Sequence, residues 1–212
     1  VSFSVKHSKL KELNDSNIII WTTTPWTIPA NKALAYNKNL DYLVLEIQDE
    51  GDFYNKKIVI SEALKDSVIK DCGIKKFKDL KRFKGEQFQG TICQHPFINL
   101  GYDYEIPMLE ASFVTTEQGT GIVHCAPSHG PDDFNLCINN GIKAIETVDG
   151  DGRYTSNVPL FEGVHIFKSN SVVIEKLKNE KNLLSSGELI HSYPPVSYTH
   201  LRAHATSLQL VC

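Results

Sequence analysis

Short apolar stretches that glycine and proline interrupt make up most of this chain, which favours strands over long helices. Four runs are β-branched or alternate in polarity, and we predict them as strands: residues 17–22, 40–47, 57–60 and 121–125. Residues 74–116 alternate in the same way between closely spaced breaks at Gly85, Gly90, Pro96, Gly101 and Pro107. This segment is therefore expected to form a meander of strands and loops.

Three segments carry helix signals. Residues 61–73 start at Ser61, a favourable N-cap, and stop at Gly73. Residues 131–140 open with two aspartates and are followed by Gly141. Residues 169–184 form the clearest amphipathic pattern, with apolar side chains on one side at Val172, Val173, Leu177 and Leu184. We therefore predict an α+β domain with a barrel-like β core and a few surrounding helices.

Composition narrows the class of protein. The 212 residues suit one domain, and a net charge of −3 argues against a generic polyanion binder. Five cysteines without C-x-x-C spacing indicate free thiols in a reducing compartment and make a zinc site unexpected. No apolar run is long enough to cross a membrane, and no signal peptide is visible. The start at Val1 rather than Met favours a fragment of a longer protein.

Two long motifs stand out, one at residues 21–31 (WTTTPWTIPAN) and one at residues 119–134 (GTGIVHCAPSHGPDDF). They resemble the two signature segments of the editing domain, CP1, that is inserted in isoleucyl-tRNA synthetases. Related valyl and leucyl enzymes have an arginine after the threonines and lack the His-x-Ala-Pro pattern. The contexts of Trp26 and His124 therefore favour the isoleucyl type over these relatives.

The resemblance covers residues 1–194 and then stops. Residues 195–212 match nothing in the family, so we expect a non-native tail in which His200, His204 and Cys212 carry no function. The ATP-site signatures of the parent synthetase are absent, so the resemblance implies editing without a cofactor, whereas the parent would use ATP and Mg elsewhere. A cytoplasmic monomer is expected, with a mitochondrial origin left open.

The resemblance implies hydrolysis of mischarged Val-tRNA(Ile). One methylene in an apolar pocket is worth roughly 1–3 kcal/mol, a range for which these enzymes are themselves the usual example. A second, smaller hydrolytic pocket would admit valine and exclude isoleucine. The expected partners are the 3′ acceptor end of tRNA(Ile) carrying valine and the remainder of the synthetase. The alternative is an acceptor-end binding module without hydrolytic activity.

Site residues follow from the same resemblance. It assigns Thr23, Thr24 and Asp133 to catalysis, with Asp133 also anchoring the substrate ammonium. The other implied substrate-binding residues are Thr22, Trp26, Asn31 and His124. No metal ligand is expected.

Each role has a structural alternative. Thr22, Thr23 and Thr24 are also good strand formers, and the aspartates favour a helix N-terminus. Trp26 is a pocket wall or a core aromatic; Asn31 is a hydrogen-bonding or a turn residue. His124 is expected to limit side-chain size and not to act as a general base.

Cys125 follows His124, and adjacent strand residues face opposite ways, so a Cys–His dyad is disfavoured. We expect direct attack by a positioned water. The basic stretch Lys75 to Lys84 is interpreted as a solvated surface rather than a contact with the tRNA backbone.

Overall fold

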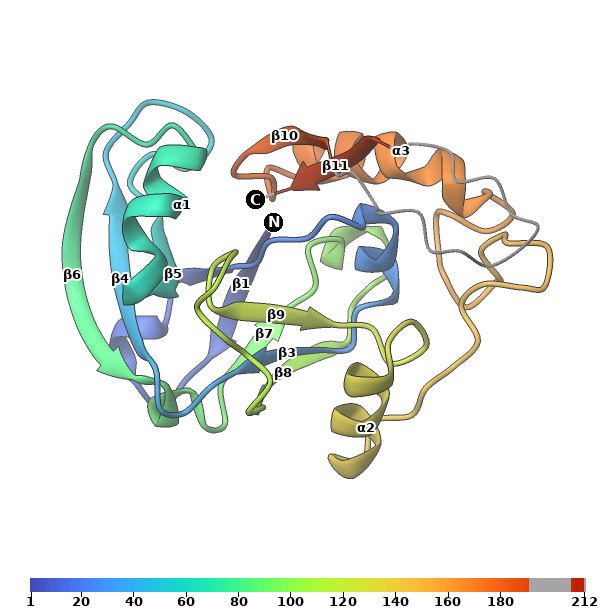
Figure 1. Ribbon diagram of the computed structural model, residues 1–212, viewed down its shortest axis with the longest axis horizontal. Helices are drawn as coiled ribbons and strands as arrows, with labels where there is room; N and C mark the ends of the chain where they lie inside the picture. The colour runs from blue at the N-terminus through green and yellow to red at the C-terminus, as the bar shows by residue number, and fades with distance from the viewer. Residues whose placement is uncertain (191–206, 212) are drawn as a thin grey trace, which may run out of the picture.

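Nine strands pair into one open mixed sheet in the computed structural model, which describes residues 1–190 and 207–211 (Figure 1). Their order is β6-β4-β5-β2-β1-β7-β8-β3-β9, so β6 and β9 are the two edges. The strands are β1 (Ser2–His7), β2 (Ser16–Ile19), β3 (Ala33–Tyr36), β4 (Asp41–Ile47), β5 (Lys57–Ser61), β6 (Phe77–Lys84), β7 (Ile92–Gln94), β8 (Glu105–Glu110) and β9 (Ile122–Cys125).

Helices are short and lie around this sheet. The α-helices are α1 (Lys65–Asp71), α2 (Pro131–Asn139) and α3 (Ile166–Asn179). The 3₁₀ segments are η1 (Lys11–Leu13), η2 (Pro25–Ala30), η3 (Glu62–Leu64), η4 (Gly85–Phe88) and η5 (Ile98–Leu100). None of the described helices is long and apolar enough to cross a membrane.

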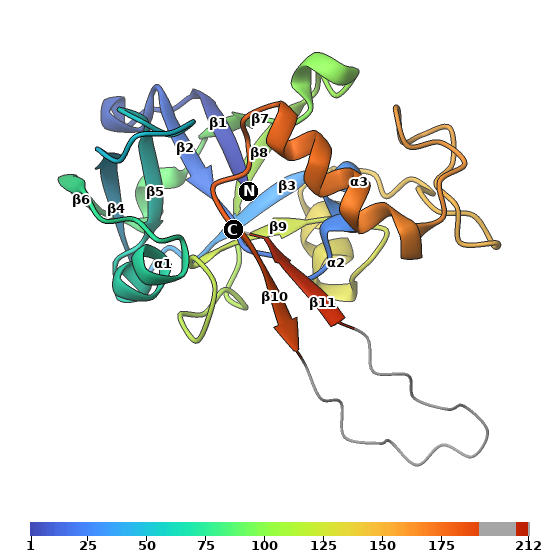
Figure 2. The ribbon, with the colours of Figure 1, turned by 90° about the horizontal axis from the view of Figure 1, so that it is seen from above.

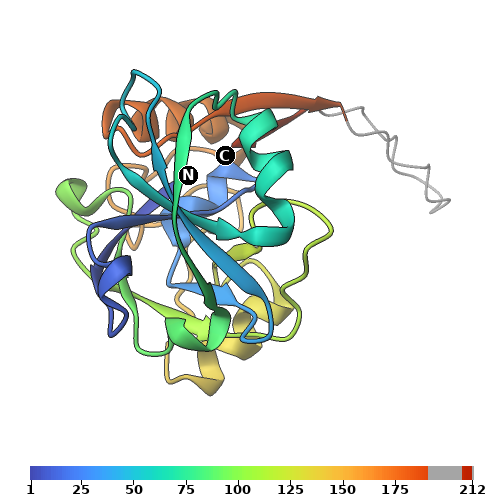
Figure 3. The ribbon, with the colours of Figure 1, turned by 90° about the vertical axis from the view of Figure 1, so that its left-hand side faces the viewer.

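The core consists of three clusters that the helices cover from different sides. The largest joins β1, β2, β7 and β8 with α3, whose Val173 and Leu177 are fully buried. Figure 2 shows α3 beside β7 and β8. A second cluster joins β4 and β5 with α1, which lies beside these strands in Figure 3. The third packs β3 and β9 against α2.

The predicted α+β class is confirmed, but the sheet does not close into a barrel. The predicted strands at 40–47, 57–60 and 121–125 are present as β4, β5 and β9, whereas the strand predicted at 17–22 ends at Ile19. Closure would require β6 to pair with β9, and no such pairing occurs between them.

The helix predicted over residues 169–184 lies at 166–179 instead. Its N-cap is His165, whose Nδ1 accepts a hydrogen bond from the Phe167 backbone N–H at 3.3 Å. Ser169, the expected start, is fully buried inside the first turns. Lys181 then takes a left-handed conformation with φ of 57°, so the chain leaves the helical path before Leu184.

A second, two-stranded sheet pairs β10 (Ser186–Ile190) with β11 (Ser207–Val211) in antiparallel register. It extends away from the main sheet in Figures 2 and 3. The predicted boundary at residue 194, together with His200, His204 and Cys212, lies outside the described residues. The prediction of a non-native tail therefore stays a prediction.

Hydrogen bonds join the glycine-rich start of the second motif, residues 119–121, to strands β4 and β5. Gly121 has a φ of 74° and its carbonyl oxygen accepts a hydrogen bond from the Tyr42 hydroxyl at 2.9 Å. The Ser61 backbone N–H donates to the Thr120 carbonyl at 2.8 Å. A β-carbon at position 121 would overlap Cβ of Ser61, so only glycine fits there.

Replacing Gly121 by alanine should therefore destabilise the fold strongly. We expect Gly121→Ala to lower the free energy of unfolding by about 2–5 kcal/mol, combining left-handed strain with overpacking. Gly73→Ala is the matched control, because Gly73 has a φ of 66° but no atom within 4 Å of the added carbon. Urea unfolding followed by circular dichroism measures both, and equal losses would contradict the steric argument.

Candidate functional site

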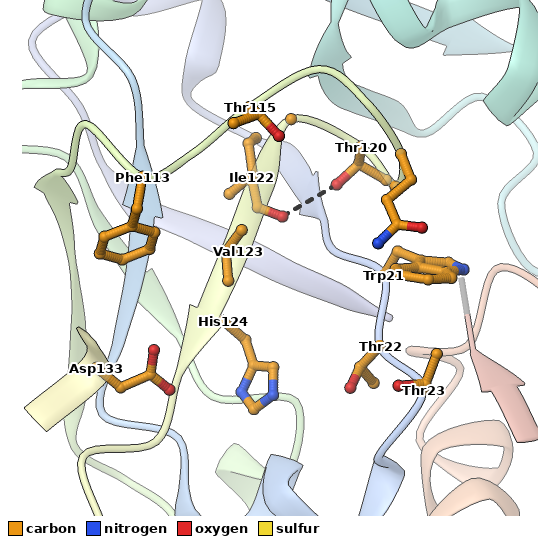
Figure 4. A pocket seen from close by; sticks show the side chains of 13 residues that line it. Trp21, Thr22, Thr23, Phe113, Thr115, Thr120, Ile122, Val123, His124 and Asp133 are labelled. Atoms are coloured by element: carbon orange, nitrogen blue, oxygen red, sulfur yellow. Dashed lines mark hydrogen bonds between the residues drawn. The ribbon is translucent and has the colours of Figure 1, made fainter. Parts of the chain in front are cut away.

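A cavity of about 310 Å³ lies between the segment after β2, the loop before β9, and the start of α2. Figure 4 shows its side chains, with Asp133 and Phe113 at one end, Trp21 at the other, and His124 between them. The residues that line it are Trp21, Thr22, Thr23, Phe113, Thr115, Gln118, Gly119, Thr120, Gly121, Ile122, Val123, His124 and Asp133. Both motif segments therefore contribute to one cavity.

The three consecutive threonines form a hydrogen-bonded turn that leads into η2. The Thr22 hydroxyl accepts a hydrogen bond from the Thr24 backbone N–H at 3.1 Å and lies 3.3 Å from the Thr24 hydroxyl. Pro25 begins η2, as its fixed φ favours at a first helical position. The chain therefore turns directly after Thr22 and Thr23, which face the cavity.

His124 is buried, with 9% of its surface exposed, and both of its ring nitrogens have partners. Nε2 lies 2.9 Å from the Thr27 hydroxyl oxygen and Nδ1 lies 3.4 Å from the side-chain nitrogen of Asn31. Burial lowers the pKa of His124 to about 4, and the nearby His129 and chain terminus act in the same direction. The ring is therefore neutral at physiological pH.

Asp133 lies in the first turn of α2, which begins with Pro131. Its Oδ2 accepts a hydrogen bond from the Ala126 backbone N–H at 2.9 Å. Burial raises the pKa of Asp133, with a further contribution from Asp132, while the Ala126 hydrogen bond opposes the shift. The carboxylate is thus held in place at the cavity, and none of the described residues that line the cavity is a lysine or an arginine.

Comparisons with known proteins identify relatives of this chain, although no family model matches it. Isoleucine–tRNA ligase of Pelagibacter ubique is 73% identical over 193 residues, covering 91% of this chain and 21% of that protein. The ligases of Gluconobacter oxydans and Saccharophagus degradans are 40% and 38% identical and cover 86% and 91% of this chain. The chain spans about one fifth of the length of these relatives.

Solved structures give the fold independently. The crystal structure of GlLeuRS-CP1 has a TM-score of 0.62 at 14% identity and covers 85% of this chain and 86% of its own. The cytosolic leucyl-tRNA synthetase editing domain of P. knowlesi has a TM-score of 0.61 at 14% identity, covering 80% and 84%. This chain belongs to the isoleucine–tRNA ligase family.

Four of the predicted site residues of this ligase segment come together around the cavity: Thr22, Thr23, His124 and Asp133. Thr24 and Asn31 do not line it. The Thr24 hydroxyl contacts the Thr22 hydroxyl at 3.3 Å without reaching the cavity lining. Asn31 is fully buried, and its side-chain nitrogen donates a hydrogen bond to the Ala33 carbonyl at 2.9 Å.

Trp26 does not line the cavity either. Its ring packs edge-on against His129 at 4.8 Å between centroids and joins the largest core cluster. Its backbone N–H donates to the side-chain oxygen of Asn170 on α3 at 3.0 Å. Of the two interpretations of Trp26, the core aromatic fits the structure better than the pocket wall.

Sequence reasoning assigned no role to several lining residues. Trp21, Gly119, Thr120 and Gly121 stand inside the quoted motifs, so their position was a usable signal. Phe113, Thr115 and Gln118 lie in or beside the loop between β8 and β9, where no local pattern marks a residue as facing a cavity.

Cys125 faces away from His124, as alternation along a strand requires. Its side chain is fully buried with Ala33, Ala35 and Cys137, and burial raises the pKa of its thiol. The predicted absence of a Cys–His dyad at this position is in keeping with the structure. Within residues 1–190 and 207–211, no group of three or more His, Cys, Asp or Glu side chains could hold a metal ion.

Three of the cations in the basic stretch along β6 pair with carboxylates of the same domain. Lys81 lies 3.2 Å from Glu12, and Lys84 lies 2.9 Å from Asp41. Arg82 contacts both Asp41 and Glu62. These pairs favour the interpretation as an ordinary solvated surface.

The charge of Asp133 should lower the stability of this ligase segment at neutral pH. The folded-state pKa of Asp133 is raised, so between the unfolded-state pKa and the folded-state pKa the folded chain binds more protons than the unfolded chain. Stability therefore falls as pH rises through this range. Asp133→Asn retains an acceptor for Ala126. We expect Asp133→Asn to be more stable than the wild type at pH 7, with the difference vanishing well below the ordinary aspartate pKa of about 3.9.

Urea unfolding of both proteins across this pH range measures the difference. Asp132→Asn, which removes an exposed carboxylate from the same helical turn, controls for the loss of negative charge near the helix N-terminus. A wild type that is the more stable protein at pH 7 would refute the argument.

Proposed function

We propose that this segment hydrolyses the ester bond of mischarged Val-tRNA(Ile). The observation that carries the proposal is that hydroxyl groups, a neutral imidazole and a half-buried carboxylate line one cavity. Its volume of about 310 Å³ falls at the lower end of the range for small-molecule sites, which suits an amino acid more than a large ligand. The family relationship supports the same reaction.

Asp133 would bind the α-ammonium group of the attached amino acid. A carboxylate and an ammonium form a charge-assisted hydrogen bond, which is strong where water is excluded. Burial disfavours the charged form of Asp133, so a bound cation would relieve that cost. Binding of the amino acid and ionisation of Asp133 would therefore favour each other.

His124 would form the wall that limits side-chain size. Its neutral ring sits at the middle of the cavity, with both nitrogens engaged by the protein. A ring held in this way has no free lone pair with which to accept a proton from water, so general-base catalysis by His124 is disfavoured. Its contribution would be steric.

Thr22 and Thr23 would position water and the ester. Their hydroxyls both donate and accept, as needed to hold a water molecule near a carbonyl carbon. The water oxygen would form the new bond to that carbon, the ester bond to the ribose oxygen would break, and the ribose oxygen would leave with a proton. Thr24 would act indirectly, because its backbone N–H and its hydroxyl hold the Thr22 hydroxyl in place.

The proposed partners are the 3′ end of tRNA(Ile) and the rest of the ligase. The relatives named isoleucine–tRNA ligase extend well beyond this chain, which covers 21% of the Pelagibacter ubique protein. A net charge of −3 predicts weak tRNA affinity for the segment alone. The second candidate function is an acceptor-end binding module, which the same cavity would serve without hydrolysis.

Loss of the Asp133 charge should abolish most of the activity. We expect Asp133→Asn to slow valine release from Val-tRNA(Ile) by roughly 10–100-fold, the value of one hydrogen bond to a charged group. Asp132→Asn should leave the rate unchanged because Asp132 does not line the cavity. Release of labelled valine under single-turnover conditions measures both.

The same assay separates the two candidate functions. If the folded wild type releases no valine above the spontaneous rate, the hydrolase proposal fails. Retention of Val-tRNA(Ile) in a filter-binding assay would then support the binding module.

Removal of the His124 ring should change which ester is cleaved. We expect His124→Ala to raise hydrolysis of Ile-tRNA(Ile) by roughly 10–200-fold relative to Val-tRNA(Ile), since one methylene accounts for that range of discrimination. His129→Ala is the control, because His129 contacts Trp26 and Thr147 outside the cavity lining. Unchanged discrimination in His124→Ala would show that another residue forms the wall.

A further inference from the structure

Phe167 is the most exposed large apolar side chain among the described residues. It has 87% of its surface open to solvent, whereas the other exposed side chains of this kind range from 37% to 53%. Phe167 lies in the first turn of α3, whose Val173 and Leu177 face the core. Burial of a phenyl ring against a partner removes apolar surface from water and is therefore favourable. The first turn of α3 is thus a candidate docking surface.

The imidazole of His165 extends the phenyl ring of Phe167 into one aromatic surface, the aromatic pair. The two ring centroids lie 5.2 Å apart, and the ring planes meet at 27°. Nδ1 of His165 also accepts a hydrogen bond from the Phe167 backbone N–H at 3.3 Å. On the other side of the imidazole lies Gly152, where an added β-carbon would come within 3.3 Å of Nε2. The imidazole is therefore held in place before a partner binds, which lowers the entropic cost of docking.

The charges around the aromatic pair do not favour a nucleic acid as the partner. Asp149 and Asp151 are exposed in the turn that leads to Gly152. Arg153 and Lys168 are exposed beside them and carry the opposite charge, so these four side chains sum to zero. A surface that binds phosphates has an excess of lysine and arginine instead. A protein surface is therefore the favoured occupant.

Helix α3 lies on the side of the molecule where the first residues and the strand after α3 come together. The Ser2 backbone N–H donates a hydrogen bond to the carbonyl of Asn182, shortly after α3, at 2.9 Å. Figure 1 shows the N-terminus, α3 and β10 together on this side. The chain covers only 21% of the Pelagibacter ubique ligase. The rest of such a ligase is therefore joined to the segment close to α3.

The aromatic pair lies at the opposite end of α3 from Asn182. The helix has 14 residues, so it is about 21 Å long. Ser171 and Lys178 follow Phe167 at helical spacing and are exposed as well, so one open helix face runs along this length. An ordinary interface of about 800 Å² per partner spans such a distance. A protein body that is attached near Asn182 can therefore reach Phe167 along α3.

We propose that the aromatic pair and the exposed face of α3 form the surface on which this segment docks against the rest of its ligase. The partner would offer an apolar pocket to the phenyl ring and polar groups to Lys178 at the rim. Docking there would hold the cavity in one orientation relative to the rest of the enzyme. The inference rests on the proposed function for its partner, the rest of the ligase, and does not depend on hydrolysis.

Hydrogen exchange of the backbone amides in residues 160–170, followed by mass spectrometry, tests the docking. The segment alone is compared with the Pelagibacter ubique ligase, 73% identical, in which this segment replaces the matching stretch. The Phe167 and Lys168 amides both donate to His165, so they report on opening of the first turn. We expect their exchange to be about tenfold slower in the ligase without tRNA, because a buried phenyl ring stabilises the turn.

Three variants separate docking from the stability of the helix itself. Phe167→Ser removes the ring at little change in helix propensity, and His165→Asn removes the imidazole but keeps a favourable N-cap. Both should lose most of the slowing in the ligase, while the urea midpoint of the segment alone stays unchanged. Phe134→Ser is the matched control. Phe134 is 45% exposed on α2, on the opposite side of the molecule in Figure 1, so this variant should keep the slowing.

Three results would overturn the proposal. Equal exchange of residues 160–170 in the segment alone and in the wild-type ligase would exclude docking there, whether or not the variants fold. Slowing that appears only after tRNA is added would assign the surface to RNA. Self-association of the segment in analytical ultracentrifugation, lost in Phe167→Ser, would assign it to a second copy.

The two proposals fail in different ways. A ligase that releases no valine disproves the proposed hydrolysis, while the exchange rates still decide the docking. A ligase that releases valine but shows no slowing in residues 160–170 disproves the docking alone.

Discussion

The antiparallel pairing of β3 with β9 is the constraint on which the site depends. It sets Leu34 opposite His124, and so brings the second motif against the end of the first, ninety-three positions earlier at Asn31. Side chains alternate along a strand, so a slip of one residue would turn the imidazole away and present Cys125 instead. The buried faces of β3 and β9 forbid that slip, because Cys125 fills a small apolar cluster with Ala33 and Ala35.

Two polar groups at or near the cavity lower the stability of the fold. Asp133 keeps a carboxylate in a place that disfavours its charge, and Oδ1 of Asn31 is buried without a hydrogen-bond partner among the described residues. Residues that do not themselves line the cavity hold its walls in place. Tyr42 and Ser61 fix the loop at Gly121, and the Ala126 backbone N–H fixes Asp133.

Local signals in the sequence were sufficient for some elements and not for others. The prediction of α2 succeeded because Pro131 and two aspartates mark its start, and Gly141 adopts a left-handed φ of 76° after its end. The start of α3 was missed because its N-cap is a histidine, which is not among the usual capping residues.

The open sheet depends on parallel pairings, β2 with β5 and β3 with β8, which join distant strands and leave no local pattern. Likewise, no local pattern indicates that Trp26 packs against the largest core cluster instead of lining the cavity.

The spacing of the first motif has a physical cause that the residue types alone do not reveal. In a 3₁₀ segment, side chains three positions apart lie above one another, and η2 brings the Thr24 and Thr27 hydroxyl oxygens within 3.4 Å. The Thr27 hydroxyl also donates a hydrogen bond to the Thr24 carbonyl at 2.9 Å and lies 2.9 Å from Nε2 of His124. An ordinary α-helical turn would rotate Thr27 away from Thr24 and lengthen these contacts. Pro25 begins the segment and Pro29 has no backbone N–H to donate, so the segment stays short, and the position of Thr27 beside the imidazole follows from the geometry of the turn.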